Sequence, residues 1–325
     1  MKGMVVRADS GGLGWQTLAL ARMLEPDRLL IIDSTPFNNA EQHFERFDRF
    51  PDKVSISGFP TNIDCATFLN GLTDIITCEL PYNWELYRLA NLRGIKTYAQ
   101  QNWEFDDLLL NRLLPALHTV LVPSYWHLAD FKAMYRRALY LPPPTFAEDF
   151  ERARAVNLGM TGRARFLHSI GHTAAHDRNG TLIVLEALKH TMADFELVLK
   201  AQSPYELTCN DPRLTLDLSA PEEQQEVYSG FTASIFPRRY GGLALPMNEA
   251  LMSALPVIMS DVSPNNEALP AEWLVPATTS RSFMARTQIP IYDTYPIALA
   301  AKIDEFCAMS DEELSAAKAK AYALG

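Results

Sequence analysis

Short runs of apolar and β-branched residues alternate, from Met4 to Pro123, with segments whose apolar positions recur every three or four residues. The runs predict strands buried on both faces of a parallel sheet: Met4–Arg7, Leu29–Asp33, Val54–Ser57, Asp74–Thr77, Lys96–Ala99 and Thr119–Pro123. The longer segments predict helices over Trp15–Leu24, Trp84–Leu92 and Phe105–Leu117. This order is typical of βαβ units, in which helices cover both faces of the sheet.

Three consecutive prolines within Leu139–Phe150 interrupt this alternation, because proline cannot continue a helix or a central strand. The polar, arginine-rich residues up to Arg165 then resemble a linker. After them the pattern predicts a helix over Leu182–His190 and four more strands: Phe166–Ile170, Phe195–Lys200, Leu214–Leu218 and Ala233–Phe236.

We therefore predict an α/β protein of two Rossmann-like domains with parallel sheets. The expected bounds are 1–150 for the first domain and 151–294 for the second. Residues 295–325 are expected to form amphipathic C-terminal helices that pack back across both domains. A chain of 325 residues, 48% of them apolar, is long enough for two such cores.

The formal net charge of −10 disfavours a broad electrostatic grip on nucleic acid, which requires a basic face. Lys132, Arg136 and Arg137 are the candidates for a local basic groove. The four cysteines are scattered without a C-x-x-C pair, so we expect reduced thiols and no zinc site. No segment has the pattern of a signal peptide or the apolar length of a membrane span, which predicts a cytoplasmic protein without an integral membrane segment.

The most informative stretch is Phe236–Asp261, which predicts a buried strand, a glycine turn, a helix that begins near Leu243, and a second buried strand. Gly241 and Gly242 carry no Cβ, so the backbone can approach a ligand closely. The amides at the start of the helix suit a phosphate. Glu249 lies about two turns into the helix and is placed to accept sugar hydroxyls. This combination matches the chemistry of a nucleotide-sugar.

The stretch resembles the GT-B glycosyltransferases, most closely the large retaining group called family 4 or group 1, including compact members of the kind that some bacteriophages carry. A common pattern there is Pro-Ser-x-x-Glu-Gly-Phe-Gly-Leu-Pro-x-x-Glu-Ala, followed by a Pro-Val-Ile strand and Ser-Asp. The resemblance is specific only within Phe236–Glu267. The residues that match are Pro237, Gly242, Leu245, Pro246, Glu249, Ala250, Pro256, Val257, Ile258, Ser260, Asp261 and Glu267.

The resemblance implies a donor site in the second domain. Glu249 would bind the ribose hydroxyls, and the amides of Gly242, Leu243 and Ala244 would hold the donor sugar and phosphates. Gly241 stands where the pattern has an earlier Glu that touches the donor sugar, so the identity of that sugar cannot be transferred.

The resemblance also implies a pair of cations on the first loop of the second domain. The position of the Arg is His172 here, and the spacing places the Lys at Asn179. We expect the adjacent Arg178 to supply the charge, because a guanidinium can hold a phosphate bidentately. Arg238 and Arg239 precede the glycine turn and are expected to help hold phosphate; the alternative is a solvated corner.

Two loops of the first domain are candidates for the site where donor and acceptor meet. In the loop after the first strand, Gly12 and Gly14 are expected to line the donor, and Asp9 and Ser10 the acceptor. Such loops lie at the carboxyl edge of a doubly wound sheet, where ligands bind. The alternative is a tight turn between strand and helix.

The second loop, Gln100–Glu104, follows the strand Lys96–Ala99. We expect Gln101, Asn102 and Trp103 to bind the acceptor, and Asn102 and Glu104 to join Arg178 in catalysis. The alternative, compatible with the first, is that Asn102 caps a helix and Glu104 supports its first turn.

The resulting prediction is an enzyme that moves a sugar from a nucleoside-diphosphate sugar, most simply a UDP-sugar, to a hydroxyl. No metal or other cofactor is expected, because protein cations would stabilise the leaving diphosphate; retention of anomeric configuration is implied by the resemblance. The sequence does not identify the acceptor, which could be a saccharide, a lipid-linked sugar, a protein or a hydroxylated base of modified DNA. The alternatives are a non-catalytic GT-B relic that binds nucleotide-sugar and a different two-domain enzyme, such as a sugar-phosphate epimerase of related fold.

Overall fold

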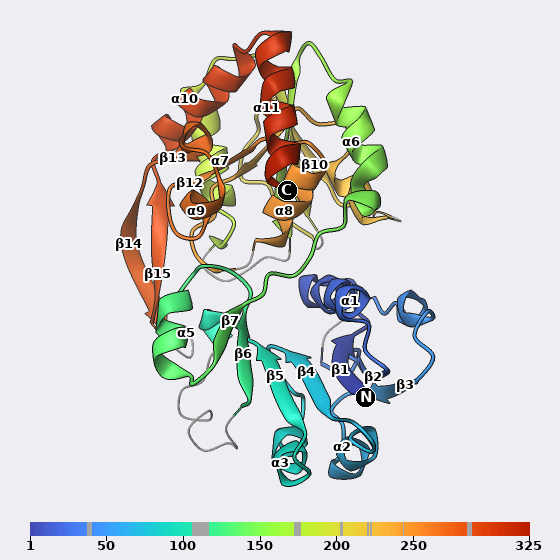
Figure 1. Cartoon of the computed structure of the whole chain (residues 1–325). Helices are drawn as coiled ribbons and strands as arrows, with labels where there is room; N and C mark the ends of the chain where they lie inside the picture. Colours follow the sequence, from blue (N-terminus) through green and yellow to red (C-terminus); the bar gives the residue numbers. More distant parts are fainter. Residues whose placement is uncertain are drawn as a thin grey trace. The chain divides into compact units, whose positions relative to one another are not determined.

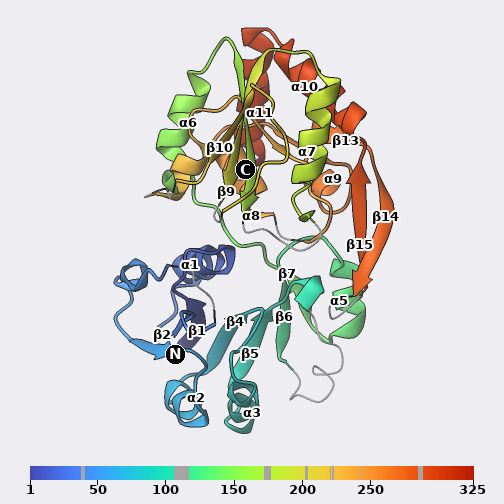
Figure 2. The same ribbon diagram turned by 180° about the vertical axis from the view of Figure 1, so that it is seen from behind.

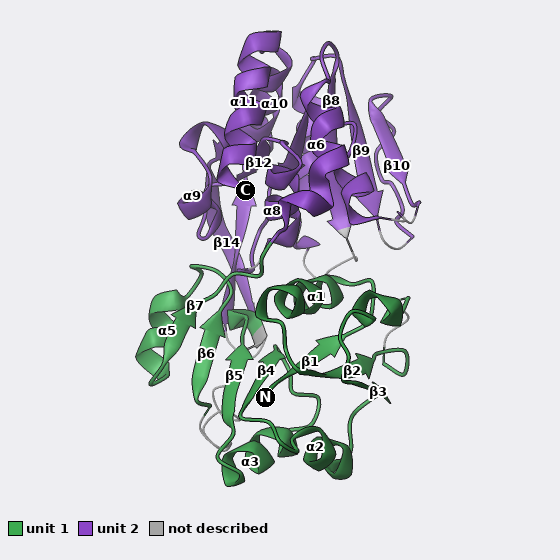
Figure 3. Ribbon diagram, turned by 45° about the vertical axis from the view of Figure 1, so that its right-hand side comes forward, with its two compact units in different colours: residues 1–144, 285–287 green, residues 145–284, 288–325 purple. Residues whose placement is uncertain are grey.

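The computed structural model describes residues 1–37, 41–105, 117–171, 177–201, 204–219, 221, 223–242, 244–284 and 288–325. Its contacts divide the chain into two compact units (Figure 3). Unit 1 contains residues 1–144, and unit 2 contains 145–284 and 288–325. Each unit is an α/β layer structure around its own parallel sheet, as predicted.

Unit 1 has a seven-stranded sheet in the order β3-β2-β1-β4-β5-β6-β7, with every neighbouring pair parallel. The six predicted strands are confirmed, with bounds that differ by at most a few residues. Only the short edge strand β7 was not predicted. The strands are β1 Lys2–Arg7, β2 Arg28–Asp33, β3 Lys53–Ser57, β4 Asp74–Cys78, β5 Lys96–Gln100, β6 Thr119–Val122 and β7 Ala138–Tyr140.

Successive residues of a strand point to opposite faces, and this alternation builds the two layers of unit 1. On β1, Met4 and Val6 pack with α1 (Gly12–Leu24), whereas Val5 packs with α2 (Asn62–Phe68) and α3 (Glu85–Leu92). Helix α5 (Leu128–Met134) covers β6 and β7. Single 3₁₀ turns are η1 Phe44–Phe47 and η2 Trp103–Phe105. The helix predicted over Phe105–Leu117 lies almost entirely outside the described residues.

Unit 2 has a six-stranded parallel sheet in the order β10-β9-β8-β11-β12-β13. The four predicted strands and the predicted Pro-Val-Ile strand are confirmed. Their bounds are β8 Ala164–Gly171, β9 Phe195–Ala201, β10 Leu214–Asp217, β11 Ala233–Phe236 and β12 Val257–Ser260, with the short β13 Leu274–Val275 at the edge. A two-stranded antiparallel hairpin, β14 Ala277–Met284 and β15 Gln288–Thr294, was not predicted.

The helices of unit 2 lie on both faces of its sheet. Helix α10 packs on α7, and α11 packs on α8; α8 and α11 face the viewer in Figure 1, and α7 and α10 in Figure 2. The bounds are α6 Glu151–Leu158, α7 Thr181–Ala187, α8 Leu245–Met252, α9 Asn265–Ala268, α10 Pro296–Cys307 and α11 Asp311–Leu324, with 3₁₀ turns η3 Ala147–Phe150, η5 Leu188–His190, η6 Gln224–Tyr228 and η7 Ala271–Trp273.

One segment differs from expectation. The arginine-rich stretch predicted as a linker instead forms α6, directly after η3, because Phe150, Ala153 and Asn157 are buried in unit 2. The C-terminal segment forms two helices, and Ser310 and Glu313 form a capping box that starts α11. The packing of these helices across both domains stays a prediction.

Each sheet has a topological switch point, where the strand order reverses direction. In unit 1 it lies between β1 and β4, and in unit 2 between β8 and β11. Loops at the carboxyl ends of these strand pairs form the crevice in which doubly wound proteins bind ligands. The predicted site residues Asp9, Ser10, Arg178 and Gly241 all belong to these loops.

Candidate functional site: an arginine-lined glycine turn

An arginine cluster occupies the switch point of unit 2. Arg178 follows β8, and Arg238 and Arg239 follow β11, the neighbouring strand. The two loops are joined directly, because the Arg239 amide donates to the Arg178 carbonyl at 2.9 Å. Arg238 and Arg239 are only 5% and 6% exposed, so they belong to the wall of the site and do not form a solvated corner.

Two guanidinium groups converge over Gly241. Its φ of +101° suits glycine, and a Cβ added there would lie 2.7 Å from Nη2 of Arg238 and closer still to Nη2 of Arg178. The backbone conformation thus favours glycine, and both guanidinium groups would have to move to admit a Cβ. The Arg178 guanidinium also lies 5.4 Å from the centre of the Tyr240 ring. The position that carries a Glu in the resembling pattern is therefore a centre of positive charge in this chain.

The β14–β15 hairpin supports this turn. Nη2 and Nε of Arg239 donate to Oδ1 of Asp293 on β15 at 2.6 and 2.8 Å. The Tyr292 amide donates to the Arg239 carbonyl at 2.9 Å, and the Tyr240 ring packs edge-on against Phe283 of β14 at 4.9 Å. These contacts fix the course of the backbone that carries Arg238 and Gly241.

The other predicted cation positions have different roles or lie outside the described residues. Nδ2 of Asn179 donates to the carbonyls of Ser169 and Ile170, at 3.2 and 2.7 Å, and so ties the loop to β8. Asp177 accepts from the amides of Thr181 and Leu182 and caps α7. His172 and Leu243 lie outside the described residues.

Helix α8 follows the glycine turn and begins at Leu245, two residues later than predicted, with Pro246 in its first turn. Gly242 and Ala244 are buried between the arginines and this helix start. The N-terminal end of a helix carries partial positive charge, which adds to that of the arginines.

Glu249 on α8 is buried and anchored by η6. Its carboxylate accepts hydrogen bonds from the Tyr228 hydroxyl and from Nε2 of Gln224. Burial raises the pKa of Glu249 to about 7, although the hydrogen bond from Tyr228 lowers it. A carboxylate with four lone-pair sites can still accept hydroxyl groups beside these two donors.

The switch point of unit 1 carries the predicted acceptor residues Asp9 and Ser10. Asp9 is 1% exposed, pairs with Nε of Arg7, and accepts from the Gly11 amide at 2.8 Å. The Ser10 amide donates to the Glu41 carbonyl at 2.8 Å. Gly12 begins α1, and Gly14 packs so tightly on the Asp9 carbonyl that no Cβ fits. The glycines therefore also serve the tight turn that was the alternative interpretation.

Gln101 and Asn102 reach across to β4. Nε2 of Gln101 donates to the Glu79 carbonyl at 3.0 Å, and Nδ2 of Asn102 donates to Oε1 of Glu79 at 2.6 Å. Asn102 is 6% exposed, and its buried Oδ1 accepts no hydrogen bond from the described residues, so they show no capping bond to it. Trp103 instead stacks on His127 at 4.4 Å, and Glu104 is buried.

Comparison with solved structures decides the fold. Anabaena Alr3699/HepE in complex with UDP-glucose matches with a TM-score of 0.68 over 100% of this chain and 94% of that chain, at 10% identity. A glycosyltransferase from Rickettsia africae ESF-5 matches with a TM-score of 0.67 over 99% and 94%, at 12% identity. The chain has the GT-B fold.

A third GT-B structure is an alpha-glucosyltransferase in complex with UDP and a 13-mer DNA that contains an HMU base. It matches with a TM-score of 0.57 over 99% of this chain and 94% of that chain, at 10% identity. No protein-family model matches the sequence, and no curated protein sequence does so. Identities this low establish the GT-B fold and leave the chemistry to be argued from this chain's own residues.

Sequence reasoning missed residues near the candidate site of each unit. Asp293 was missed because it lies on a hairpin that the pattern did not reveal. Glu79 and Tyr82 follow β4, and both have a left-handed backbone, with φ near +59°. The position of these two residues in the sequence could have revealed them. They directly follow β4, which neighbours β1 at the reversal of strand order, and polar residues after such a strand line the crevice.

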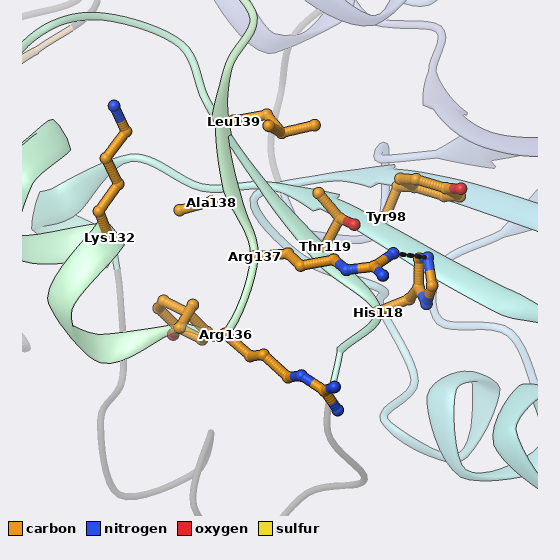
Figure 4. Close-up of a pocket in the computed structure, with 9 residues that line it drawn as sticks. Tyr98, His118, Thr119, Lys132, Arg136, Arg137, Ala138 and Leu139 are labelled. Atoms are coloured by element: carbon orange, nitrogen blue, oxygen red, sulfur yellow. Dashed lines mark hydrogen bonds between the residues drawn. The ribbon is translucent and has the colours of Figure 1, made fainter.

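The predicted basic residues Lys132, Arg136 and Arg137 line a separate hollow in unit 1, of about 540 Å³ (Figure 4). His118 also lines it, and its Nε2 lies 3.1 Å from Nη1 of Arg137. His118 and Ala138 stand where β6 and β7 begin. Because parallel strands all begin at the same edge, this hollow lies toward the amino edge of the sheet, away from Asp9 and Asn102.

Within the described residues, no three His, Cys, Asp or Glu side chains are grouped to hold a metal ion, and all four cysteines are unpaired. Across that same part of the chain, every helix is too short or too polar to cross a lipid bilayer.

Proposed function

We propose that this GT-B chain is a glycosyltransferase that uses a UDP-sugar as donor, with the donor bound by unit 2 and the hydroxyl acceptor bound by unit 1. The observation that carries the proposal is the convergence of Arg178 and Arg238 over Gly241, beside the start of α8. Two guanidinium forks and a helix N-terminus form a strong site for a diphosphate. UDP or UDP-glucose is bound in several structures with the same fold.

In the proposed reaction, the bond between the anomeric carbon and the β-phosphate oxygen breaks, and a bond forms from that carbon to the acceptor hydroxyl oxygen. The hydroxyl proton passes to the departing UDP, so that charge and atoms balance. Arg178 and Arg238 stabilise the negative charge that grows on the diphosphate. This role makes the transfer metal-independent, and retention of configuration is part of the proposal because the resemblance implies it.

Glu249 is proposed to bind the ribose hydroxyls. Tyr228 and Gln224 fix its carboxylate, so little side-chain freedom remains to be lost on binding. Loss of a hydrogen bond costs roughly 0.5–1.5 kcal/mol, or about 1.5–3 kcal/mol where the acceptor is ionised, and the ribose offers two hydroxyls. Glu249→Ala should therefore weaken UDP binding by about ten- to a hundredfold.

The test is UDP release from a panel of UDP-sugars, in buffer that contains EDTA. Arg178→Ala and Arg238→Ala should each lower kcat by about a hundredfold or more, the usual effect of removing one donor to a developing anion. Arg152→Ala is the matched control, because Arg152 is an exposed arginine of unit 2 that pairs with Glu223. Unchanged kcat in both variants, or activity abolished by EDTA, would contradict the proposed roles.

One observation favours a second candidate, a non-catalytic protein that binds nucleotide-sugar. Gly241 removes the acidic group that touches the donor sugar in the resembling pattern. A relic of this kind would bind UDP yet release none from any UDP-sugar. Calorimetry and the release assay on one sample separate the two candidates.

A further inference from the structure

Three aromatic side chains gather at the carboxyl edge of the unit 1 sheet. Phe37 follows β2, Phe59 follows β3, and Tyr82 follows β4. The loops after β2 and β3 run side by side, because the Gly58 amide donates to the Asp33 carbonyl at 2.9 Å. Three segments that are distant in the sequence therefore present their rings at the edge that carries Asp9.

The rings form a continuous platform. Phe37 and Phe59 stack with their centres 5.1 Å apart and their planes 18° from parallel. Tyr82 lies 6.2 Å from Phe37 and 6.4 Å from Phe59. Phe59 is 63% exposed and Phe37 39% exposed, although burying such rings would be favourable. A stacked, exposed aromatic pair beside a ligand-binding crevice is a surface for a flat partner.

Polar groups border the platform. Burial raises the pKa of Tyr82, and the charges of Arg7, Glu79 and Asp9 also act on it. The Arg7 guanidinium lies 5.9 Å from the centre of the Phe37 ring. Asn102 is bonded to Glu79 and has a buried Oδ1 that accepts no hydrogen bond from the described residues. A buried amide oxygen in this state requires a donor, such as a ligand hydroxyl.

The charge at this edge selects among ligand classes. Asp9 follows β1, Glu79 follows β4, and Asp33 is the last residue of β2. Arg7 pairs with Asp9, and the Arg46 guanidinium lies over Trp15. A nucleic-acid or lipid phosphate brought here would meet carboxylates. The basic hollow of Lys132, Arg136 and Arg137 lies toward the opposite edge of the sheet. Carboxylates and amides beside exposed aromatic rings suit the hydroxyls and C–H faces of an uncharged sugar.

We propose that the Phe37–Phe59–Tyr82 platform binds a neutral saccharide, which stacks on the rings while its hydroxyls bond Asn102 and the neighbouring carboxylates. This inference rests on the proposed function, for which it supplies the chemical class of the acceptor. The hydroxyl that attacks the donor belongs to this saccharide.

The test is saturation-transfer NMR on the full chain, with a panel of neutral disaccharides (maltose, cellobiose, lactose and diacetylchitobiose) and a DNA oligonucleotide that contains 5-hydroxymethyluracil. At least one disaccharide should bind through the C–H groups of one ring face. Phe59→Ala should weaken that binding by about tenfold, and Phe59→Trp should restore it. Leu92→Ala is the control, because it removes another exposed apolar side chain, 70% exposed, at the end of α3.

The outcomes separate this inference from the proposed function. Phe59 is exposed, so Phe59→Ala should melt like the wild type, and any loss of binding then reports on the platform. Equal binding by Phe59→Ala, binding of the DNA alone, or no binding of any disaccharide at millimolar concentration would overturn the inference. Calorimetry with UDP on the same samples tests the donor site: UDP binding without saccharide binding refutes only the platform, and the reverse refutes only the donor site.

Discussion

At the scale of a single residue, the Glu249 carboxyl is costly to ionise in the folded protein, because it is buried. Its folded-state pKa is raised to about 7 by burial, from an ordinary value of 4.5. The folded protein therefore holds a proton that the unfolded chain has released between these two pH values. By linkage, the stabilising contribution is complete below about pH 4.5 and is lost as the pH rises through about 7.

Glu249→Gln should remove this pH dependence. At 1.36 kcal/mol per pKa unit, the wild-type free energy of unfolding should fall by up to about 3 kcal/mol relative to the variant between pH 4.5 and pH 8. Urea unfolding of both proteins across this range measures the difference. If the free energies of unfolding of the two proteins changed with pH in parallel, the Glu249 carboxyl would have an ordinary pKa in the folded protein.

Gly241 allows the sharpest test of the arginine cluster. Gly241→Ala should destabilise the protein by about 1–3 kcal/mol, because alanine is strained at this φ and its Cβ displaces both guanidinium groups. Gly162→Ala is the matched control, since Gly162 also has a positive φ, of +82°, but faces open space. Only Gly241→Ala should also weaken UDP binding in calorimetry. Equal effects of the two substitutions on UDP affinity would show that the arginine cluster does not bind UDP.

At the scale of an element, helix α6 shows how a polar sequence can form a helix that is anchored in the core. Asn157 is fully buried and makes four hydrogen bonds, which is its full capacity. Its Nδ2 donates to the carbonyls of Tyr228 and Ser253, both at 2.8 Å, and its Oδ1 accepts from the amides of Gly230 and Phe231. The helix is thus joined to the segments that lead into β11 and follow α8.

Asn157→Ala should lower the free energy of unfolding by about 2–4 kcal/mol, because buried backbone groups lose their partners. Val156→Ala on the same helix changes a side chain that is 48% exposed and should cost less than about 0.5 kcal/mol. Urea unfolding compares the two. A similar small effect from both would mean that water replaces the asparagine.

The central strands were predictable because they are compact apolar runs bounded by polar residues, as in Leu29–Asp33 and Ala233–Phe236. Helix α6 was not, since its few buried residues, such as Asn157, are polar or small. The hairpin β14–β15 was also missed: β14 is largely exposed and lacks an apolar run. The glycine turn was predictable from its motif, but the fit of Arg178 onto Gly241 joins residues more than sixty positions apart and required coordinates.

At the scale of the whole molecule, each sheet carries its candidate site residues in loops at the reversal of strand order. Unit 2 presents guanidinium groups there, and unit 1 presents carboxylates, an amide and aromatic rings. This division of charge supports the proposal that the diphosphate binds to unit 2 and a neutral acceptor to unit 1. Local clustering of arginines in unit 2 would allow a chain with a net charge of −10 to bind an anion.

Arg178 and Arg238 are proposed to hold the diphosphate of a UDP-sugar over Gly241. Calorimetric titration of UDP into the wild type, Arg178→Ala/Arg238→Ala and the Arg152→Ala control tests it most directly. We expect saturable UDP binding by the wild type and the control, and a loss of UDP affinity of about a hundredfold or more in the double variant. Equal UDP affinity in all three proteins, or no UDP binding by the wild type, would contradict it.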